Sequence, residues 1–187
     1  MRIAIVGTSG RGDNNETENM TSELYAKMLE IAEQYLLKAQ ELDDAVSLIS
    51  GGAAWSDHLA VSLHLKYKVP LILHLPCKFT DKFVPGDNSS KQWGTAKTAN
   101  ELHQKFSAVV GFDSLAQLEQ VQKTAIKYGQ GFLARNTQIV ENADWLLAFS
   151  WSTSDKKITG GTGDTWRKFI ASKGSEYAVH VSLSNLV

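Results

Sequence analysis

The chain has 187 residues, which is enough for roughly one domain of ordinary size with a full hydrophobic core. Lys and Arg together number 19 and Asp and Glu number 20, and neither sign forms a run, so nonspecific binding to the phosphate backbone of nucleic acids is a poor hypothesis. The single cysteine, Cys77, excludes an intramolecular disulfide framework and a metal site made of four thiolates, and it fits a reducing cytoplasm.

The first part of the chain alternates between strand and helix patterns. The β-branched run Arg2–Val6 ends at a glycine and is typical of a strand that is buried on both faces. Apolar residues at spacings of three or four predict a helix from Met20 to about Leu42 and another from Trp55 to Tyr67. Strands are expected at Ala45–Ile49 and Pro70–Leu75. Three successive strand–helix units indicate a parallel sheet with right-handed crossovers and helices on both faces.

The pattern loosens after the third expected strand. Residues 85–90 form a polar loop that contains Pro, Gly, Asp, Asn and Ser. Helical stretches follow near Thr98–Val109 and Ser114–Tyr128. We interpret residues 76–129 as a helical insertion within a single domain that spans residues 1–187, placed so that it overhangs the edge of the sheet.

The last third returns to alternating elements. We expect helices at Phe132–Asn142 and Gly163–Ser172, and strands at Asp144–Phe149 and Tyr177–Leu183. The five strands predict an α/β, Rossmann-like three-layer sandwich with a mostly parallel five-stranded sheet of order 3-2-1-4-5. In such a sheet the ligand binds at the carboxyl ends of the first and fourth strands, where the connecting loops part.

No segment suggests a membrane span or a metal site. The longest apolar stretches, such as Val69–Leu75, are far shorter than the ~20 residues that cross a bilayer. A strand-like run begins at Arg2, so no signal peptide is expected. The five histidines lack the spacing of metal-binding motifs. We therefore expect a soluble, cytoplasmic protein with no membrane partner and no bound metal.

A glycine loop follows the first expected strand and contains Gly7, Thr8, Ser9, Gly10 and Arg11. Closely spaced glycines let successive N–H groups turn toward an anion. The spacing G-x-x-G-x-G differs from the dinucleotide fingerprint G-x-G-x-x-G, and no carboxylate ends the second strand to bind a ribose hydroxyl. The P-loop sequence G-x-x-x-x-G-K-[ST] is absent as well. NAD-dependent redox chemistry and P-loop hydrolysis are disfavoured, and no cofactor is expected.

Two further glycine loops lead into expected helices. Gly51, Gly52 and Ala53 precede the helix at Trp55, whose first N–H groups and positive dipole end suit a phosphate. The loop after the fourth strand begins at Ser150 and leads into a glycine-rich helix start. That helix start contains Gly160, Gly161, Thr162, Gly163 and Asp164. Two anion cradles that face one crevice predict a ligand with phosphates and a sugar.

Together these blocks resemble the SLOG superfamily. The resemblance rests on Gly7–Arg11, on the segment Ser50–Ala60, on Arg135-Asn136 ahead of the fourth strand, and on Gly160–Thr162. The superfamily includes the DNA-processing protein A family, the lonely-guy phosphoribohydrolases and nucleotide-sensing modules of bacterial conflict systems. The resemblance covers both halves of the sheet but not the insertion. It implies a Rossmann-like pocket for nucleotides or nucleotide-derived ligands.

The resemblance also implies which residues form the pocket. By position these are Gly7, Thr8, Ser9, Gly51, Gly52, Asp57, Asn136, Gly161, Thr162 and Asp164. Nearby residues complete the candidate ligand-binding set: Gly10, Arg11, Ala53, Trp55, Arg135, Ser150, Trp151, Gly160 and Gly163. The lonely-guy signature P-G-G-x-G-T-x-x-E is incomplete here, since the chain lacks the proline before the glycines and the glutamate after them.

Some of these side chains have more specific candidate roles. Arg11 and Arg135 could clamp a phosphate, because a guanidinium can bind two oxygens at once, although a solvated arginine is an equal alternative. Trp151 is the preferred candidate for stacking on a base. Asp57 and Asp164 could form a carboxylate pair for ribosyl chemistry, but hydroxyl binding or helix capping is the favoured interpretation. No catalytic residue is therefore assigned.

The favoured function is a binding protein that senses or sequesters a nucleotide-derived small molecule. An ADP-ribose-like compound or a cyclic nucleotide signal, in a bacterial or phage conflict system, would suit the pocket that the resemblance implies. The enzyme alternative is a nucleotide N-glycosidase (phosphoribohydrolase) or a deoxyribosyltransferase-like enzyme. A DNA-processing-type binder of single strands is the second alternative, which the near-neutral charge disfavours. A homo-oligomer is expected.

Overall fold

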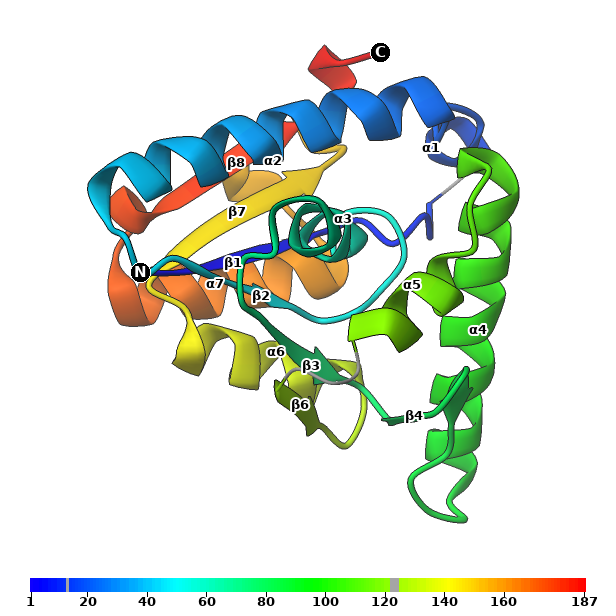
Figure 1. The fold of residues 1–187 in the computed structure, drawn as a ribbon. Helices are drawn as coiled ribbons and strands as arrows, with labels where there is room; N and C mark the ends of the chain where they lie inside the picture. Colours follow the sequence, from blue (N-terminus) through cyan, green and yellow to red (C-terminus); the bar gives the residue numbers. More distant parts are fainter. Residues whose placement is uncertain (13, 122–124) are drawn as a thin grey trace.

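The computed structural model describes residues 1–12, 14–121 and 125–187, and a parallel sheet lies at its centre (Figure 1). In the described residues this sheet has six strands in the order β6-β3-β2-β1-β7-β8, and every neighbouring pair is parallel. The strands are β1 (Arg2–Gly7), β2 (Ser47–Ser50), β3 (Leu71–Leu75), β6 (Ala125–Tyr128), β7 (Trp145–Ser150) and β8 (Ala178–Ser182). The predicted order 3-2-1-4-5 is thus confirmed, and β6 adds one strand beyond the five expected.

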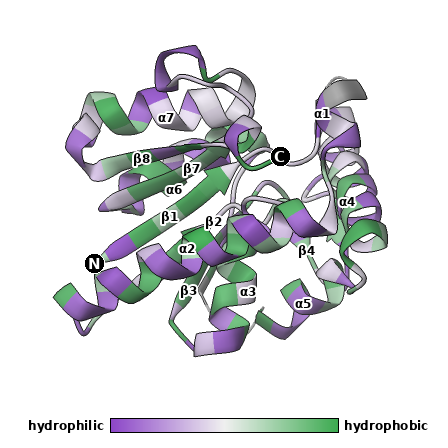
Figure 2. Ribbon diagram, turned by 90° about the horizontal axis from the view of Figure 1, so that it is seen from above, coloured by the Kyte–Doolittle hydropathy of each residue, from purple (hydrophilic) through white to green (hydrophobic). Residues whose placement is uncertain are grey.

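Helices cover both faces of the sheet, as the strand–helix alternation predicts. Figure 2 shows α2 (Ser22–Leu42) and α3 (His58–Tyr67) on one side of the sheet, and α6 (Phe132–Asn142) and α7 (Gly160–Lys173) on the other. The side chains of β1 divide accordingly: Ile3 and Ile5 pack with the first pair of helices, and Ala4 and Val6 with the second. This strand is buried on both faces, which explains its unbroken apolar sequence. The fold is a three-layer, Rossmann-like α/β sandwich.

The long helix α2 illustrates how the local sequence determines where a helix begins and which of its faces is buried. Thr21 precedes α2 and its side chain accepts a hydrogen bond from the N–H of Leu24, so the helix begins with a satisfied donor. Leu24, Met28 and Leu36 recur at helical spacing and are buried against the sheet. None of the helices in the described residues combines the length and the hydropathy that a membrane-crossing segment requires.

The insertion differs in two ways from its predicted helices. A short antiparallel hairpin, β4 (Lys78–Phe79) and β5 (Phe83–Val84), precedes α4 (Ser90–Val110). This helix begins eight residues before the expected start at Thr98, because Ser89 caps it by accepting from the N–H of Gln92. Gly111 ends the helix with φ of +78°. Figure 1 shows α4 (green) standing beside the sheet rather than on one of its faces.

The prediction of a helix at Ser114–Tyr128, the second one in the insertion, is wrong over its last part. α5 ends at Val121, and residues 125–128 form strand β6 beside β3. Ile126 and Tyr128 favour extended structure, and the unpaired edge of β3 offers hydrogen-bonding partners that a solvated helix end lacks. The pairing continues beyond the strand, where the N–H of Gly129 donates to the carbonyl of Leu75 at 2.7 Å. Residues 122–124 lie outside the described part of the chain.

The remaining elements are short. They are α1 (Asn14–Glu18), α5 (Ser114–Val121) and the 3₁₀ turns Asp155–Lys157, Ser175–Tyr177 and Leu183–Asn185. α7 begins at Gly160, three residues before the predicted start at Gly163, so the glycine run forms its first turn.

An aromatic cluster fastens α4 to the main body of the protein. Phe106 on α4 is fully buried, and its ring lies 4.9 Å from Trp55 and 5.0 Å from Tyr25, measured between ring centroids. We expect Phe106→Ala to lower the free energy of unfolding by about 3–5 kcal/mol, because it removes the ring and leaves a cavity. The matched control is Val109→Ala on the same helix, where the side chain is exposed. Chemical denaturation measures both variants, and equal losses would contradict this packing of α4.

Buried histidines make the stability depend on pH. Burial lowers the pKa of His58 to about 3, and those of His74 and His103 to about 4. These rings are neutral in the folded chain, whereas in the unfolded chain they gain protons below about pH 6.5. The unfolded state therefore binds more protons between pH 6.5 and 4, so we expect the free energy of unfolding to fall as the pH is lowered through this range. Urea denaturation at pH 7, 6 and 5 measures it. A constant or rising midpoint would show that these histidines are not buried.

Candidate functional site

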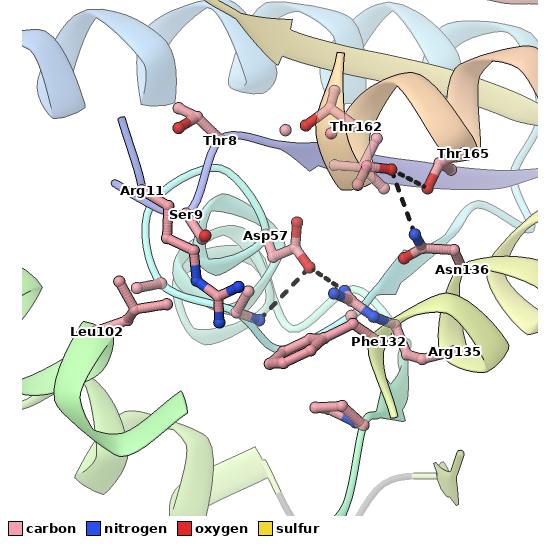
Figure 3. Close-up of a pocket in the computed structure, with 18 of the residues that line it drawn as sticks. Thr8, Ser9, Arg11, Asp57, Leu102, Phe132, Arg135, Asn136, Thr162 and Thr165 are labelled. Atoms are coloured by element: carbon pink, nitrogen blue, oxygen red, sulfur yellow. Dashed lines mark hydrogen bonds and ion pairs between the residues drawn. The ribbon is translucent and has the colours of Figure 1, made fainter. Parts of the chain in front are cut away.

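A pocket of about 440 Å³ lies at the carboxyl ends of the central strands. Figure 3 shows side chains from the loops after β1 and β2, from α4, and from the starts of α6 and α7 converging on it. This is the topological switch point between β1 and β7, where the strand order predicts a ligand. The candidate residues that line it are Gly7, Thr8, Ser9, Arg11, Gly51, Gly52, Ala53, Asp57, Arg135, Asn136, Ser150, Trp151, Gly160, Gly161 and Thr162.

Three candidates of the glycine loops do not line the pocket. Trp55 is buried and packs in the aromatic cluster of α4, which places its ring in the core rather than in the pocket lining. Gly10 is needed by that packing, because a Cβ there would lie 2.7 Å from the indole nitrogen of Trp55. A Cβ on Gly163 would overlap the carbonyl of Ile158. Neither Gly10 nor Gly163 lines the pocket, and close packing accounts for both glycines.

A buried ion pair joins the loop after β2 to α6. Nη1 of Arg135 donates to Oδ2 of Asp57 at 2.6 Å, and the N–H of Ala53 donates to the same oxygen at 3.4 Å. Burial raises the pKa of the Asp57 carboxyl, and the guanidinium of Arg135 opposes that rise. A Cβ on Gly51 would overlap both Arg135 and Asp57, so glycine is required where the pair crosses the loop.

This ion pair also involves the glycine loop after β2. The loop was predicted to hold a phosphate at the start of α3, but the carboxylate of Asp57 already occupies the N–H of Ala53. Asp57 does not cap α3 either, since its side chain makes no capping hydrogen bond. The N–H of Ala53 in this loop is therefore engaged by a carboxylate of the protein itself.

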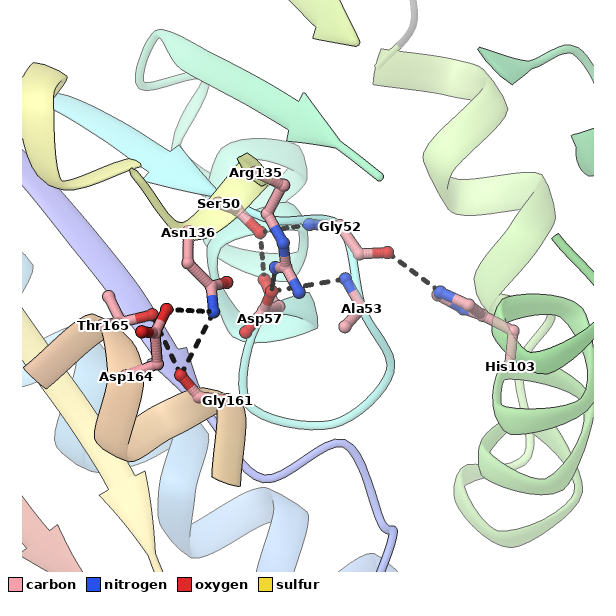
Figure 4. A network of polar contacts seen from close by, with 10 residues as sticks. All are labelled: Ser50, Gly52, Ala53, Asp57, His103, Arg135, Asn136, Gly161, Asp164 and Thr165. Atoms are coloured by element: carbon pink, nitrogen blue, oxygen red, sulfur yellow. Dashed lines mark hydrogen bonds and ion pairs between the residues drawn. The ribbon is translucent and has the colours of Figure 1, made fainter. Parts of the chain in front are cut away.

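Gly52 is explained by the turn rather than by a ligand. Its φ is +65°, and a Cβ would overlap the side chain of Leu75. Its N–H donates to Oγ of Ser50 at 3.0 Å, and its carbonyl accepts from Nε2 of His103 at 3.0 Å (Figure 4). Both backbone groups are thus engaged within the protein.

The first turn of α7 lines the pocket with residues whose N–H groups precede the first hydrogen bond of the helix. The first intrahelical bond runs from the N–H of Gly163 to the carbonyl of Thr159, so the N–H groups of Gly160, Gly161 and Thr162 precede it. Thr159 makes no side-chain capping bond. Free N–H groups and the positive end of the dipole at a helix start favour an anion, so the prediction of an anion site applies to this turn.

Asn136 and Asp164 hold that turn in place. Nδ2 of Asn136 donates to the carbonyl of Gly161 and to Oδ2 of Asp164, both at 3.2 Å (Figure 4). Asp164 also accepts from Nζ of Lys168 at 2.9 Å. Asp164 does not line the pocket, so the structure does not form the hypothesised carboxylate pair with Asp57 there. Its role is to orient Asn136 and, through it, the first turn of α7.

Two arginines line the pocket, and Arg11 is the exposed one whereas Arg135 is buried. Its guanidinium carbon lies 4.9 Å from the centroid of the Phe132 ring, and that of Arg135 lies 5.9 Å from the same centroid. Among the described residues no carboxylate forms an ion pair with Arg11. Partial burial lowers the pKa of Arg11, and the charge of Arg135 adds to the effect.

Trp151 and Ser150 line the pocket from the end of β7. Trp151 is half-buried and packs against the core, with its indole nitrogen buried and without a hydrogen-bond partner in the described part of the chain. Oγ of Ser150 lies 2.8 Å from Nε2 of His180. Stacking of Trp151 on a base remains a prediction.

Sequence reasoning missed the residues that the insertion contributes. Phe83, Ala99, Leu102 and His103 line the pocket, and so does Phe132 at the start of α6. Apolar residues at helical spacing have the same pattern whether they face a core or a cavity, so no sequence signal distinguishes them. The insertion also lies outside the family resemblance that located the other residues.

Comparison with known proteins finds one informative relative. No family model matches the chain, and no solved structure matches it. The chain is 36% identical over 174 residues to the uncharacterized protein R261 of Acanthamoeba polyphaga mimivirus, and the match covers 90% of each protein. The chain therefore belongs to the family of mimivirus protein R261.

Proposed function

We propose that the pocket binds a nucleotide-derived small molecule, such as an ADP-ribose-like compound or a cyclic nucleotide, and that the protein senses or sequesters it. The observation that carries this proposal is that Arg11, which forms no ion pair with a carboxylate among the described residues, lines the same pocket as the first turn of α7, a helix start without a side-chain cap. The resemblance to the SLOG superfamily supports the same ligand class. A volume of about 440 Å³ is in the range of small-molecule sites.

The phosphate would lie against the first turn of α7. There the N–H groups of Gly161 and Thr162 and the helix dipole favour an anion. The hydroxyls of Thr8 and Ser9 line the same pocket from the loop after β1. Arg11 would add charge-assisted hydrogen bonds, which are stronger than neutral ones.

Binding without turnover is favoured over N-glycosidase or ribosyl-transfer activity. General acid and base catalysis needs a carboxyl group that is free to exchange its proton with the substrate. Asp57 is buried and held by Arg135, Asp164 does not line the pocket, and Glu16, which does line it, is engaged in an interaction within the protein. A single-strand binder would need a basic groove along the surface, whereas the net charge is −1.

The proposal is tested by titrating the purified protein with ADP-ribose, AMP and cyclic AMP in a calorimeter, while chromatography follows release of free base. We expect saturable binding and no base release. Replacing Arg11 by Ala should weaken binding by roughly 10- to 100-fold, because hydrogen bonds to charged groups contribute about 1.5–3 kcal/mol. Lys105→Ala, which removes an exposed cation of α4 outside the pocket, is the matched control and should bind as the wild type does. Multiple turnovers would contradict a pure binder, and equal effects of the two variants would place the anion elsewhere.

A second prediction concerns the role of Asp57. If the ion pair is structural, Asp57→Asn leaves the buried Arg135 without its counter-charge and should lower the free energy of unfolding by about 3–5 kcal/mol. The double variant Asp57→Asn with Arg135→Met should recover part of this loss, since no unpaired charge remains. Thermal and chemical denaturation measure all three proteins. An Asp57→Asn variant with wild-type stability and a lost base-releasing activity would instead identify Asp57 as catalytic.

A further inference from the structure

The pocket is chemically divided between two walls. The insertion wall, as we name it, consists of Phe83 on β5 and of Ala99 and Leu102 on α4. None of these side chains can donate or accept a hydrogen bond. Across the pocket, the loop after β1 and the first turn of α7 present hydroxyls and N–H groups. The two walls therefore suit different parts of one ligand.

The polar residue beside the insertion wall is already engaged. His103 also lines the pocket, but Nδ1 lies 2.9 Å from Oγ of Ser114 and Nε2 lies 3.0 Å from the carbonyl of Gly52. Because both ring nitrogens have partners, His103 offers nothing to a ligand. Its bond to Gly52 instead ties α4 to the loop after β2, as Figure 4 shows, and fixes the insertion wall relative to the polar wall.

We propose that the insertion wall is the base subsite of this pocket and receives the face of a nucleobase, with the phosphate directed to the first turn of α7. This inference rests on the proposed function. A phosphate or a ribose placed against the insertion wall would lose its water and find no hydrogen-bond partner there. The flat face of a base instead gains from contact with apolar side chains. Leu102 is half-buried beside the pocket and is the side chain best placed to make that contact.

The division of the walls also predicts how selective the pocket is. The insertion wall provides apolar contact area but no hydrogen-bonding group. It should therefore favour ligands that have a base over ligands that lack one, and it should discriminate only weakly between different bases. AMP should bind at least about tenfold more tightly than ribose 5-phosphate, which shares its phosphate and sugar but lacks the base.

The experiment compares AMP and ribose 5-phosphate as calorimetric probes of three proteins. They are the wild type, Leu102→Asn, which replaces the apolar side chain by a neutral polar one of similar size, and the control Val109→Asn at an exposed position of the same helix. We expect Leu102→Asn to weaken AMP at least about fivefold and to leave ribose 5-phosphate unchanged. Val109→Asn should change neither affinity. If Leu102→Asn does not fold, as judged by thermal denaturation, Leu102→Ala replaces it and should show the same selective loss.

Other outcomes overturn the inference and separate it from the proposed function. An equal loss for both probes would mean that Leu102 contacts the sugar or phosphate, and no loss would place the base elsewhere. In either case binding of AMP by the wild type would still support the proposed function. A wild type that binds neither probe would overturn the proposed function and this inference together.

Discussion

The buried ion pair between Asp57 and Arg135 is the interaction on which the site depends. It connects the loop after β2 to helix α6 across the end of the sheet, and it determines that residue 51 is glycine. Asn136 follows Arg135 on the same helix and holds the first turn of α7 through the carbonyl of Gly161. The ion pair and the apolar packing of Ile139 and Val140 thus hold α6 in place, and α6 in turn contacts the first turn of α7 beside the pocket.

The ion pair between Asp57 and Arg135 also changes the interpretation of the glycine loop after β2. A glycine-rich loop before a helix is commonly taken as a place for a phosphate. Here the carboxylate of Asp57 accepts from the N–H of Ala53 in the loop after β2, and we propose the start of α7, which has no side-chain cap, as the place for a ligand's anion. Arg11 and Glu16 both line the pocket, and no carboxylate in the described part of the chain forms an ion pair with Arg11, so Arg11 is the cation that we propose for binding an anion.

The sequence predicts the sheet order and the place of the pocket because both follow from strong local signals. The buried runs at Arg2–Val6 and Asp144–Phe149 are unambiguous strands, and their alternation with helices leaves few topologies. Strand β6 was missed because four residues at a sheet edge are stabilised by pairing with β3, which no local pattern shows. Trp55 and Asp57 were placed in the right loop, but their partners lie at Phe106 and Arg135, far along the chain. Side-chain roles that depend on such distant partners cannot be read from local spacing.

The insertion contributes apolar side chains to the pocket. Helix α4 stands beside the sheet, packs against the main body through Phe106 and is hydrogen-bonded to Gly52 through His103. It presents apolar side chains to a cavity whose other lining residues are both polar and apolar.

The most direct measurement is a crystal structure of the protein with AMP. We expect the phosphate next to Gly161 and Thr162 and the base against Leu102. A reversed ligand, or one bound outside this pocket, would contradict it.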